Sequence, residues 1–390
     1  MRSLPLARGR ALTGCCVCAA LALAGCSTTA ASSGSTVSGS TLTIYLSEPA
    51  GALTPEQQDV ISAEQLALQQ MGSTVGKFTV KTDVVRGNEL SDSARSAISD
   101  PTTIAYLGEL EPGASGQTIG ITNAQDILQV SPTDTAVELT QSVPEVSGSP
   151  GVYYESLSSN GRTFARVVPN TKLEAKALIG EMRQLGVKSL FIKSDGSAYG
   201  NALAGQLRAD ESSITAATSV AAAGGVVYAG SATTGATATF NQAASSNPSV
   251  KLLGPSALDD DTFAAALSTA AQHDLYVSSP GFVTSDLPSG GQQFISSFTA
   301  AYHHAPAPEA IFGFEAMAAV LSALHKAGSS ANDRGTVVKD FFAIRNHTSV
   351  LGTYSINSDG DISFASGAPF VFSRVRAGTL VPFKAVQQQG

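Results

Sequence analysis

Two short stretches of glycine and hydroxyl residues each follow an apolar run, and they are the best candidates for ligand chemistry. The first contributes Gly113 and Ser115, and the second contributes Thr133 and Thr135. Bare backbone N–H groups and a hydroxyl at the start of a helix can bind a carboxylate. Each stretch alone is typical of a helix-capping turn. Together they predict a two-sided cradle for a small carboxylate.

The sequence lacks the usual catalytic and phosphate-binding motifs. It contains no GxxxxGK[ST] and no GxGxxG after a strand, and residues 196–200 have flanking glycines without the GxSxG pattern. Of the five histidines only His303 and His304 are adjacent, and neighbours on a helix do not face one another. We expect neither an enzyme nor a metal site, and no cofactor.

Two acidic stretches look like cation sites but have simpler interpretations. Residues 259–261 are three aspartates at the start of a predicted helix, 262–271, where the helix dipole favours acids. Residues 357–361 lack the spacing and the final Glu of a calcium loop. They predict a hairpin turn between strands at 350–356 and 370–375.

Apolar runs and helical patterns alternate along the rest of the chain. The expected strands are 43–46, 104–107, 127–130, 187–192, 226–228, 250–253 and 275–277. After the first strand, Thr54 and Gln57 form the pattern of a helix-starting capping box. This alternation predicts parallel sheets with helices on both faces, an α/β fold. Such sheets bind ligands at the carboxyl ends of their strands, where both candidate stretches lie.

The N-terminus has the pattern of a bacterial lipoprotein signal. Three arginines precede a short apolar run, 11–24, which ends in Leu-Ala-Gly-Cys at Cys26. The run is shorter than the roughly 20 residues of a membrane span. We expect a signal peptide over 1–25 and lipid on Cys26, which would anchor the protein to the outer face of the cell membrane. An ordinary signal peptide or an anchor helix is the alternative.

The remaining chain is long enough for two lobes. Residues 26–41 contain no charge and predict a flexible tether. Without the three arginines of the signal, the chain has 20 basic and 31 acidic residues, which gives a net charge of about −11. With no Lys/Arg cluster, this balance argues against a nucleic-acid partner. The other three cysteines lie within 1–25, so the mature body would have no free thiol and no disulfide.

Seven stretches, spread in order over most of the mature chain, share the pattern of one family. They are Thr103–Glu109, Leu128–Pro132, Arg162–Pro169, Ser197–Gly200, Leu253–Pro255, Phe312–Met317 and Val350–Ile356. Together they resemble the substrate-binding lipoproteins of branched-chain amino acid ABC transporters, the leucine-binding family. The resemblance implies a two-lobed type I periplasmic-binding-protein fold with a hinge cleft. Lobe 1 would comprise 42–168 and 284–348, and lobe 2 would comprise 169–283 and 349–390.

The resemblance also assigns residues to the ligand. It implies a carboxylate cradle on Gly113 to Ser115, the backbone of Thr133 and Thr135, and ligand side-chain contacts at Tyr199 and Phe312. The chain departs from the family on the ammonium side, where Thr171 and Ser256 stand in place of carboxylates and Ser231 in place of an aromatic or polar contact. The acids that could replace them are Asp134, Glu174, Asp195 and Asp259. The segment 209–228 is also shorter than the family pattern, so a strand or helix there is expected to be trimmed.

By this resemblance the protein is a solute-binding lipoprotein of an ABC importer. It would capture an amino acid or a related small carboxylate and deliver it to permease and ATPase subunits. A ligand-sensing receptor lipoprotein and a degenerate scaffold without ligand are the alternatives with the same fold.

Overall fold

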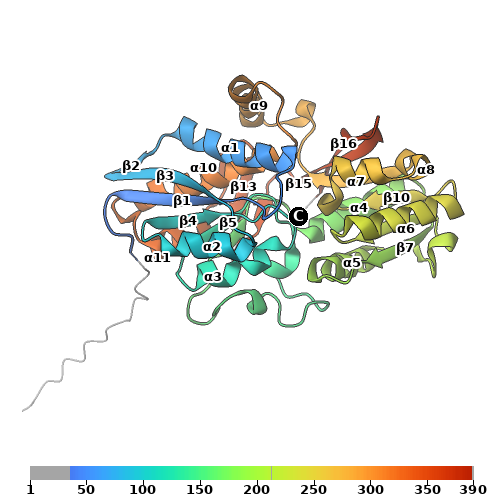
Figure 1. The fold of residues 1–390 in the computed structure, drawn as a ribbon, viewed down its shortest axis with the longest axis horizontal. Coiled ribbons are helices and arrows are strands. Elements are labelled where there is room, and N and C mark those ends of the chain that lie inside the picture. Colours follow the sequence, from blue (N-terminus) through green and yellow to red (C-terminus); the bar gives the residue numbers. More distant parts are fainter. Residues whose placement is uncertain (1–35, 212, 389–390) are drawn as a thin grey trace, which may run out of the picture. The chain divides into compact units, whose positions relative to one another are not determined.

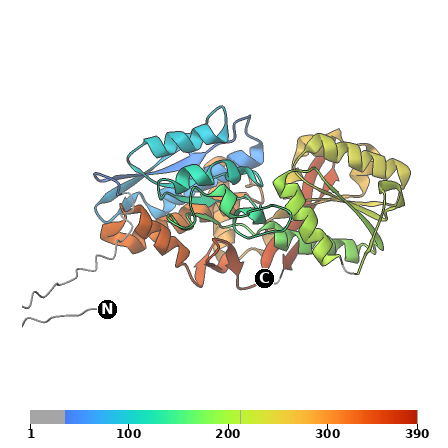
Figure 2. The same ribbon diagram turned by 90° about the horizontal axis from the view of Figure 1, so that it is seen from below.

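Two large sheets and one small sheet carry the fold, and each large sheet has helices on both of its faces (Figures 1 and 2). The structure, a computed structural model, describes residues 36–211 and 213–388. The predicted signal peptide, the lipid-bearing Cys26 and the first part of the tether lie outside the described residues.

The first sheet has the strand order β2-β3-β1-β4-β5-β6, and within it only the β2–β3 pair is antiparallel. Its strands are β1 (Thr41–Ser47), β2 (Thr74–Val75), β3 (Phe78–Val85), β4 (Thr103–Leu107), β5 (Leu128–Ser131) and β6 (Phe164–Arg166). Side chains of β1 alternate between faces, so that Ile44 and Leu46 enter one core while Tyr45 enters another.

Helices from distant parts of the chain cover this sheet. They are α1 (Pro55–Met71), α2 (Leu90–Ser99), α3 (Ile119–Asn123), α9 (Ser289–Tyr302), α10 (Ala310–Ala327) and α11 (Arg334–Phe342). Among the described residues, one helical stretch, Ala310–Ser330, is long and apolar enough to span a membrane. Because 78% of its apolar window is buried, we regard it as a core helix.

The second sheet has the order β16-β15-β11-β10-β9-β7-β8. Its strands are β7 (Ser189–Ser194), β8 (Thr215–Ala216), β9 (Gly225–Ala229), β10 (Lys251–Gly254), β11 (Leu275–Pro280), β15 (Ala368–Arg376) and β16 (Thr379–Gln388). Strands β7 to β11 are parallel, and β15 and β16 add an antiparallel edge. Its helices are α4 (Thr171–Gln184), α5 (Ala198–Asp210), α6 (Thr233–Ser246), α7 (Asp261–Ala266) and α8 (Thr269–His273). The predicted α/β architecture of two helix-covered parallel sheets is confirmed.

The chain passes between the two cores at three places. The first passage lies between β6 and α4 and the second between β11 and α9. The third differs from the predicted boundary at 349. Strands β12 (His347–Ser349), β13 (Gly352–Ile356) and β14 (Ile362–Phe364) form a separate sheet, and Tyr354 and Ile356 pack into the core of the first sheet. The chain therefore crosses after β14.

Two further segments differ from expectation. The predicted tether extends to residue 41, but Val37 is already buried in the first core, and its N–H donates to the carbonyl of Asn332 at 2.8 Å. The short segment 209–228 keeps a strand, β8, of two residues beside β7, followed by a single 3-10 turn, Val220–Ala222. That strand is therefore reduced and not removed.

Candidate ligand-binding cleft

The loops that follow the carboxyl ends of the strands bring most of the predicted site residues together. These are Gly113 and Ser115 after β4, Thr133 and Thr135 after β5, Tyr199 after β7 and Ser256 after β10. Gly113 has a left-handed backbone with φ of 85°, and a Cβ placed on it would lie 3.3 Å from Cβ of Tyr199. Loops from the first and the second sheet therefore meet at this point, as the fold class predicts.

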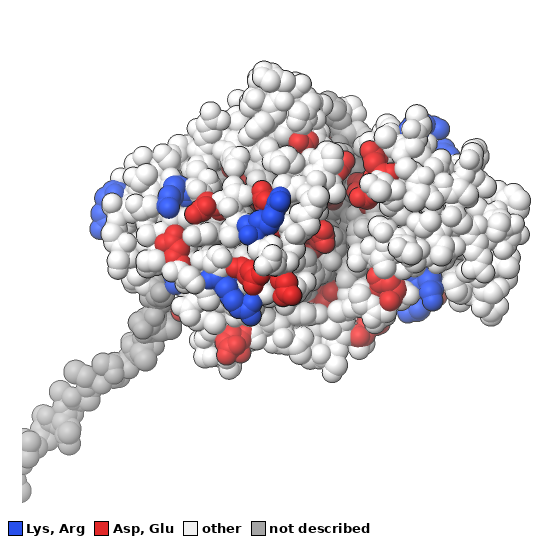
Figure 3. All heavy atoms as spheres, in the orientation of Figure 1, with Lys and Arg blue, Asp and Glu red and all other residues white. Residues whose placement is uncertain are grey.

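A cavity of about 270 Å³ opens between these loops. Three predicted residues, Thr133, Ser231 and Ser256, line it, together with residues of α1, of the loop after β4, of the segment before α7 and of the loop before α10. Figure 3 shows a hollow at this position with red Asp and Glu atoms on both sides of it. The size and the mixed lining are suited to a small molecule.

The charged side chains that line the cavity are all acidic. They are Glu56, Glu111, Asp259, Asp260 and Glu309, and the lining contains no Lys, Arg or His. Burial raises the pKa of Asp259 to about 7, and it raises the pKa of Glu309 well above its usual value, with Asp259 and Glu174 adding to that shift. The carboxylates are close enough to influence one another, but none has a cationic partner within the cavity lining.

The chain itself engages the backbone N–H groups of the predicted carboxylate cradle. Asp134 accepts hydrogen bonds from the N–H groups of Gly113 at 2.7 Å, Ser115 at 2.9 Å and Ala136 at 3.0 Å. Its side chain is fully buried, and burial raises its pKa while these N–H groups and the nearby Arg166 lower it. The backbone N–H groups of Gly113 and Ser115, two of the donors expected to bind a ligand's carboxylate, are therefore already satisfied.

A buried polar cluster lies behind the cavity and includes Ser256. Glu174, in the first turn of α4, accepts from the N–H of Ser256 at 2.6 Å and from Oγ of Ser278 at 2.8 Å. The Ser256 hydroxyl is close enough to lower the pKa of Glu174, which burial raises to about 7. Even so, neither Ser256 Oγ nor Glu174 Oε2 makes a hydrogen bond of ordinary geometry to a described residue.

Tyr199 and Thr135 belong to the same cluster. Burial raises the pKa of Tyr199 well above its usual value, and the adjacent Glu174 carboxylate raises it further. The Thr135 hydroxyl is also buried and lacks a hydrogen bond of ordinary geometry to the described part of the chain. Of the acids predicted to replace the family's carboxylates, Glu174 reaches this cluster and Asp259 lines the cavity.

The other predicted residues have different surroundings. Thr171 Oγ1 accepts from the N–H of Val137 at 3.0 Å, so its side chain supports the loop after β5. Phe312 is fully buried in the first core and does not line the cavity, because it lies on the core-facing side of α10. Asp195 accepts from the N–H of Ser231 at 3.0 Å and thereby fixes the loop that brings Ser231 to the cavity rim.

Sequence reasoning missed three of the acids in the cavity, Glu56, Glu111 and Glu309. Glu56 lies in the first turn of α1, where the predicted capping box of Thr54 and Gln57 is confirmed. Glu309 is the residue before α10 and marks the start of a strongly apolar helix. In both cases the sequence shows an acid at the N-terminus of a helix. It does not show which helix N-termini border the same cavity. Among the described residues, no group of three or more His, Cys, Asp or Glu could hold a metal ion.

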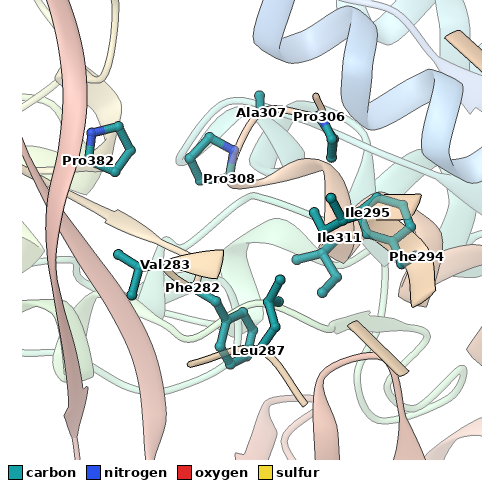
Figure 4. A pocket seen from close by; sticks show the side chains of 10 residues that line it. All are labelled: Phe282, Val283, Leu287, Phe294, Ile295, Pro306, Ala307, Pro308, Ile311 and Pro382. Atoms are coloured by element: carbon teal, nitrogen blue, oxygen red, sulfur yellow. The ribbon is translucent and has the colours of Figure 1, made fainter. Parts of the chain in front are cut away.

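A second hollow, of about 310 Å³, lies near the second passage between the sheets (Figure 4). Its lining is apolar and includes Phe282, Leu287, Phe294, Ile311 and, across the opening, Pro382. It contains none of the residues predicted for the ligand and no charged side chain. The acidic cavity is therefore the better candidate site.

No family model matches the sequence, and no curated protein matches it. Solved structures match the fold. The leucine-binding protein LivK from Thermotoga maritima has a TM-score of 0.71 at 16% identity, covering 89% of this chain and 99% of that chain. LivJ from Streptococcus pneumoniae, in complex with isoleucine, has a TM-score of 0.68 at 15% identity, with 89% and 99% covered.

A solute-binding protein of an ABC transporter from R. palustris, in complex with benzoate, has a TM-score of 0.66 at 17% identity and covers 89% of this chain and 97% of that chain. All three are binding proteins for small molecules. The chain therefore has the type I periplasmic-binding-protein fold, the fold of the leucine- and branched-chain amino acid-binding proteins.

Proposed function

We propose that this protein is the solute-binding component of an ABC importer and captures a small molecule in the cleft between its two sheets. The observation that carries the proposal is the cavity at the carboxyl ends of the strands of both sheets, which Thr133, Ser231 and Ser256 line. Its size is suited to a small molecule, so we assign solute binding to this cleft.

The sequence favours an amino acid, of branched-chain type, or a related small carboxylate as the ligand. The acids of the cavity support recognition of an ammonium group, because Asp259 and Glu174 lie near the positions where Ser256 and Thr171 replace the family's carboxylates. A ligand with an ammonium group fits the cleft whether or not it also carries a carboxylate.

The protein would act outside the cell membrane, held by lipid on Cys26 and passing its solute to permease and ATPase subunits. Changing Cys26→Ser in the full chain is expected to release the protein into the medium and to abolish labelling by a radioactive fatty acid. Retention of the label in this variant would contradict the anchor.

Thermal melting of residues 34–390 tests the binding role. The panel contains amino acids, keto acids, amides, amines and sugars, and a ligand at 100 times its Kd stabilises the protein by about 2.7 kcal/mol. Ser231 lines the cavity and is exposed, so Ser231→Trp should fill the cavity and remove the shift. Ser96→Trp, at an exposed position of α2, is the matched control.

A compound that stabilises the wild type and Ser96→Trp but not Ser231→Trp would support a solute-binding cleft. No stabilisation by any member of the panel, or equal stabilisation of all three proteins, would contradict it. The degenerate scaffold without ligand would then be the better interpretation.

A further inference from the structure

Asp134 engages backbone donors of the predicted carboxylate cradle with both of its carboxylate oxygens. They accept from the N–H groups of Gly113 at 2.7 Å and Ser115 at 2.9 Å, and one of them also accepts from Ala136 at 3.0 Å. The side chain of Asp134 is fully buried. Hydrogen bonds from backbone N–H groups to a carboxylate are strong because the acceptor is charged. The anion that these three donors hold is therefore a side chain of the protein itself.

Other groups of the cradle are also used within the chain. The hydroxyl of Thr133 donates to the carbonyl of Leu110 at 2.6 Å, and its N–H donates to Oγ of Ser131 at 3.3 Å. Ser115 Oγ accepts from the N–H of Glu109 at 3.0 Å. A solute carboxylate at this place would break such contacts, and buried polar groups left without a partner destabilise a protein.

The positive charge beside the cradle is already balanced. Arg166 is fully buried, donates to the carbonyl of Asp134 at 2.6 Å and pairs with Asp361 at 3.0 Å. Burial raises the pKa of Asp134, while Arg166 and the backbone N–H groups lower it. A second carboxylate beside Asp134 would meet a like charge where water is excluded, and such charges repel strongly.

The cradle adjoins the wall of the cavity of about 270 Å³. Pro112 and Thr133 line this cavity, and Gly113 and Asp134 are the residues that follow them in the chain. Among the described residues, the lining includes no Lys, Arg or His that could pair with a carboxylate elsewhere in the cavity. A solute in the cavity therefore meets loops whose position for an anion is filled by Asp134.

Given the proposed solute-binding function, we propose that Asp134 determines the specificity of this cleft. It supplies the carboxylate that the loops after β4 and β5 require, and it excludes the carboxylate of a solute from the cradle. The proposal narrows the ligand to a compound without a carboxylate at this position, such as an amide, an amine or an alcohol. Replacement of Asp134 by a smaller residue opens the cradle to a carboxylate from solution.

Calorimetric titration of residues 34–390, which form one compact unit, with formate and formamide tests the role of Asp134. The two probes have similar size, and only formate is charged. The wild type should bind neither. Asp134→Ala should bind formate with an affinity at least about tenfold above any binding by the wild type, and it should not bind formamide. Asp134→Ser, which also frees space in the cradle, should show the same gain.

Two control variants separate the position from the charge. Asp134→Asn keeps the size of the side chain and one acceptor oxygen, so it should not bind formate. Glu155→Gln, at an exposed position outside the cavity lining, removes one negative charge elsewhere and should also leave formate unbound. The melting temperature of each protein without ligand reports whether the variants are folded.

Two matched pairs of solutes test specificity on the wild type, with no substitution. They are leucine with leucinamide and butyrate with butyramide, and in each pair an amide replaces the carboxylate. Because Asp134 excludes a carboxylate from the cradle, neither acid should bind more tightly than its amide.

Formate binding that appears only in Asp134→Ala and Asp134→Ser would support the proposal. Formate binding by the wild type, or its absence in a folded Asp134→Ala or Asp134→Ser variant, would overturn it and leave the solute-binding function intact. An acid that binds the wild type at least about tenfold more tightly than its amide would also overturn it. If no compound of the melting panel binds the wild type, the proposed function fails, and formate binding by the variants still reports separately on the cradle.

Discussion

At the scale of single residues, two buried charges determine how the loops around the cleft are held. Asp134 fixes the loop after β4 through the N–H groups of Gly113 and Ser115, and its own loop through that of Ala136. Arg166, at the end of β6, is also fully buried, donates to the carbonyls of Asp134 and Ala136, and pairs with Asp361 at 3.0 Å. The sequence singled out residues 113–115 and 133–135 as candidates. It could not show that Asp134, within the second stretch, would accept from the N–H groups of the first.

The variant Asp134→Ala should lower the free energy of unfolding by at least about 2 kcal/mol, because it leaves three backbone N–H groups, two of them buried, without an acceptor. Urea denaturation measures this loss. Added formate should restore part of the stability by occupying the emptied cradle, and Asp134→Asn, which keeps one acceptor oxygen, should lose less. A variant as stable as the wild type would contradict this role for Asp134.

The variant Arg166→Met should cost about 3–5 kcal/mol, because it leaves the buried Asp361 without its cation. The control is Arg162→Met, which breaks the partly exposed pair of Arg162 with Asp359 at 3.4 Å and should cost less than about 1 kcal/mol. Guanidinium unfolding of both variants gives the comparison. Equal losses would show that burial of the pair is unimportant.

At the scale of elements, local sequence signals predicted helix starts and turns well. They predicted less well which distant strands pair with each other. The capping box at Thr54 and the turn at 357–361 are set by neighbouring residues, and both are present. The turn leads into β14, however, whereas residues 370–375 pair with β11 and β16. The predicted helix 262–271 is divided into α7 and α8, because Ser268 accepts from the N–H of Ala271 and starts a new helix. Partners of a strand depend on tertiary packing, which a single sequence does not reveal.

Removal of the α1 cap tests the element that positions Glu56. The variant Thr54→Ala deletes a hydroxyl that accepts from the N–H of Gln57 at 3.2 Å, and it should cost about 1 kcal/mol. Urea denaturation checks the loss, with Ser96→Ala as the control within α2. An unchanged midpoint for Thr54→Ala would mean that the rest of α1 holds its first turn without the cap.

At the scale of the whole molecule, the fold buries many acids, and this makes its stability depend on pH. Burial raises the pKa of Glu109, Glu138, Glu174, Asp259 and Glu315 to about 7. Between their ordinary pKa values and about 7, the folded protein binds protons that the unfolded chain releases. Stability therefore falls as pH rises through this range and levels off above it.

The free energy of unfolding should be lower at about pH 8 than at about pH 5.5, by at least about 1 kcal/mol. Urea denaturation at the two pH values measures the difference. Glu315→Gln should reduce it, because Gln can still accept the hydrogen bond from Tyr354 and cannot ionise, while Glu155→Gln should not. Greater stability at the higher pH would contradict the raised pKa values.

The most direct measurement follows from the absence of tryptophan in the sequence. Thr233 is exposed at the rim of the cavity, so Thr233→Trp introduces a single fluorescent reporter at the cleft, and Ser96→Trp places one far from it. Titration with the compounds of the melting panel should, for at least one of them, shift the emission of the reporter at position 233 in a saturable way and leave the reporter at position 96 unchanged. No change at position 233 with any compound of the panel would contradict a ligand-binding cleft between the two sheets.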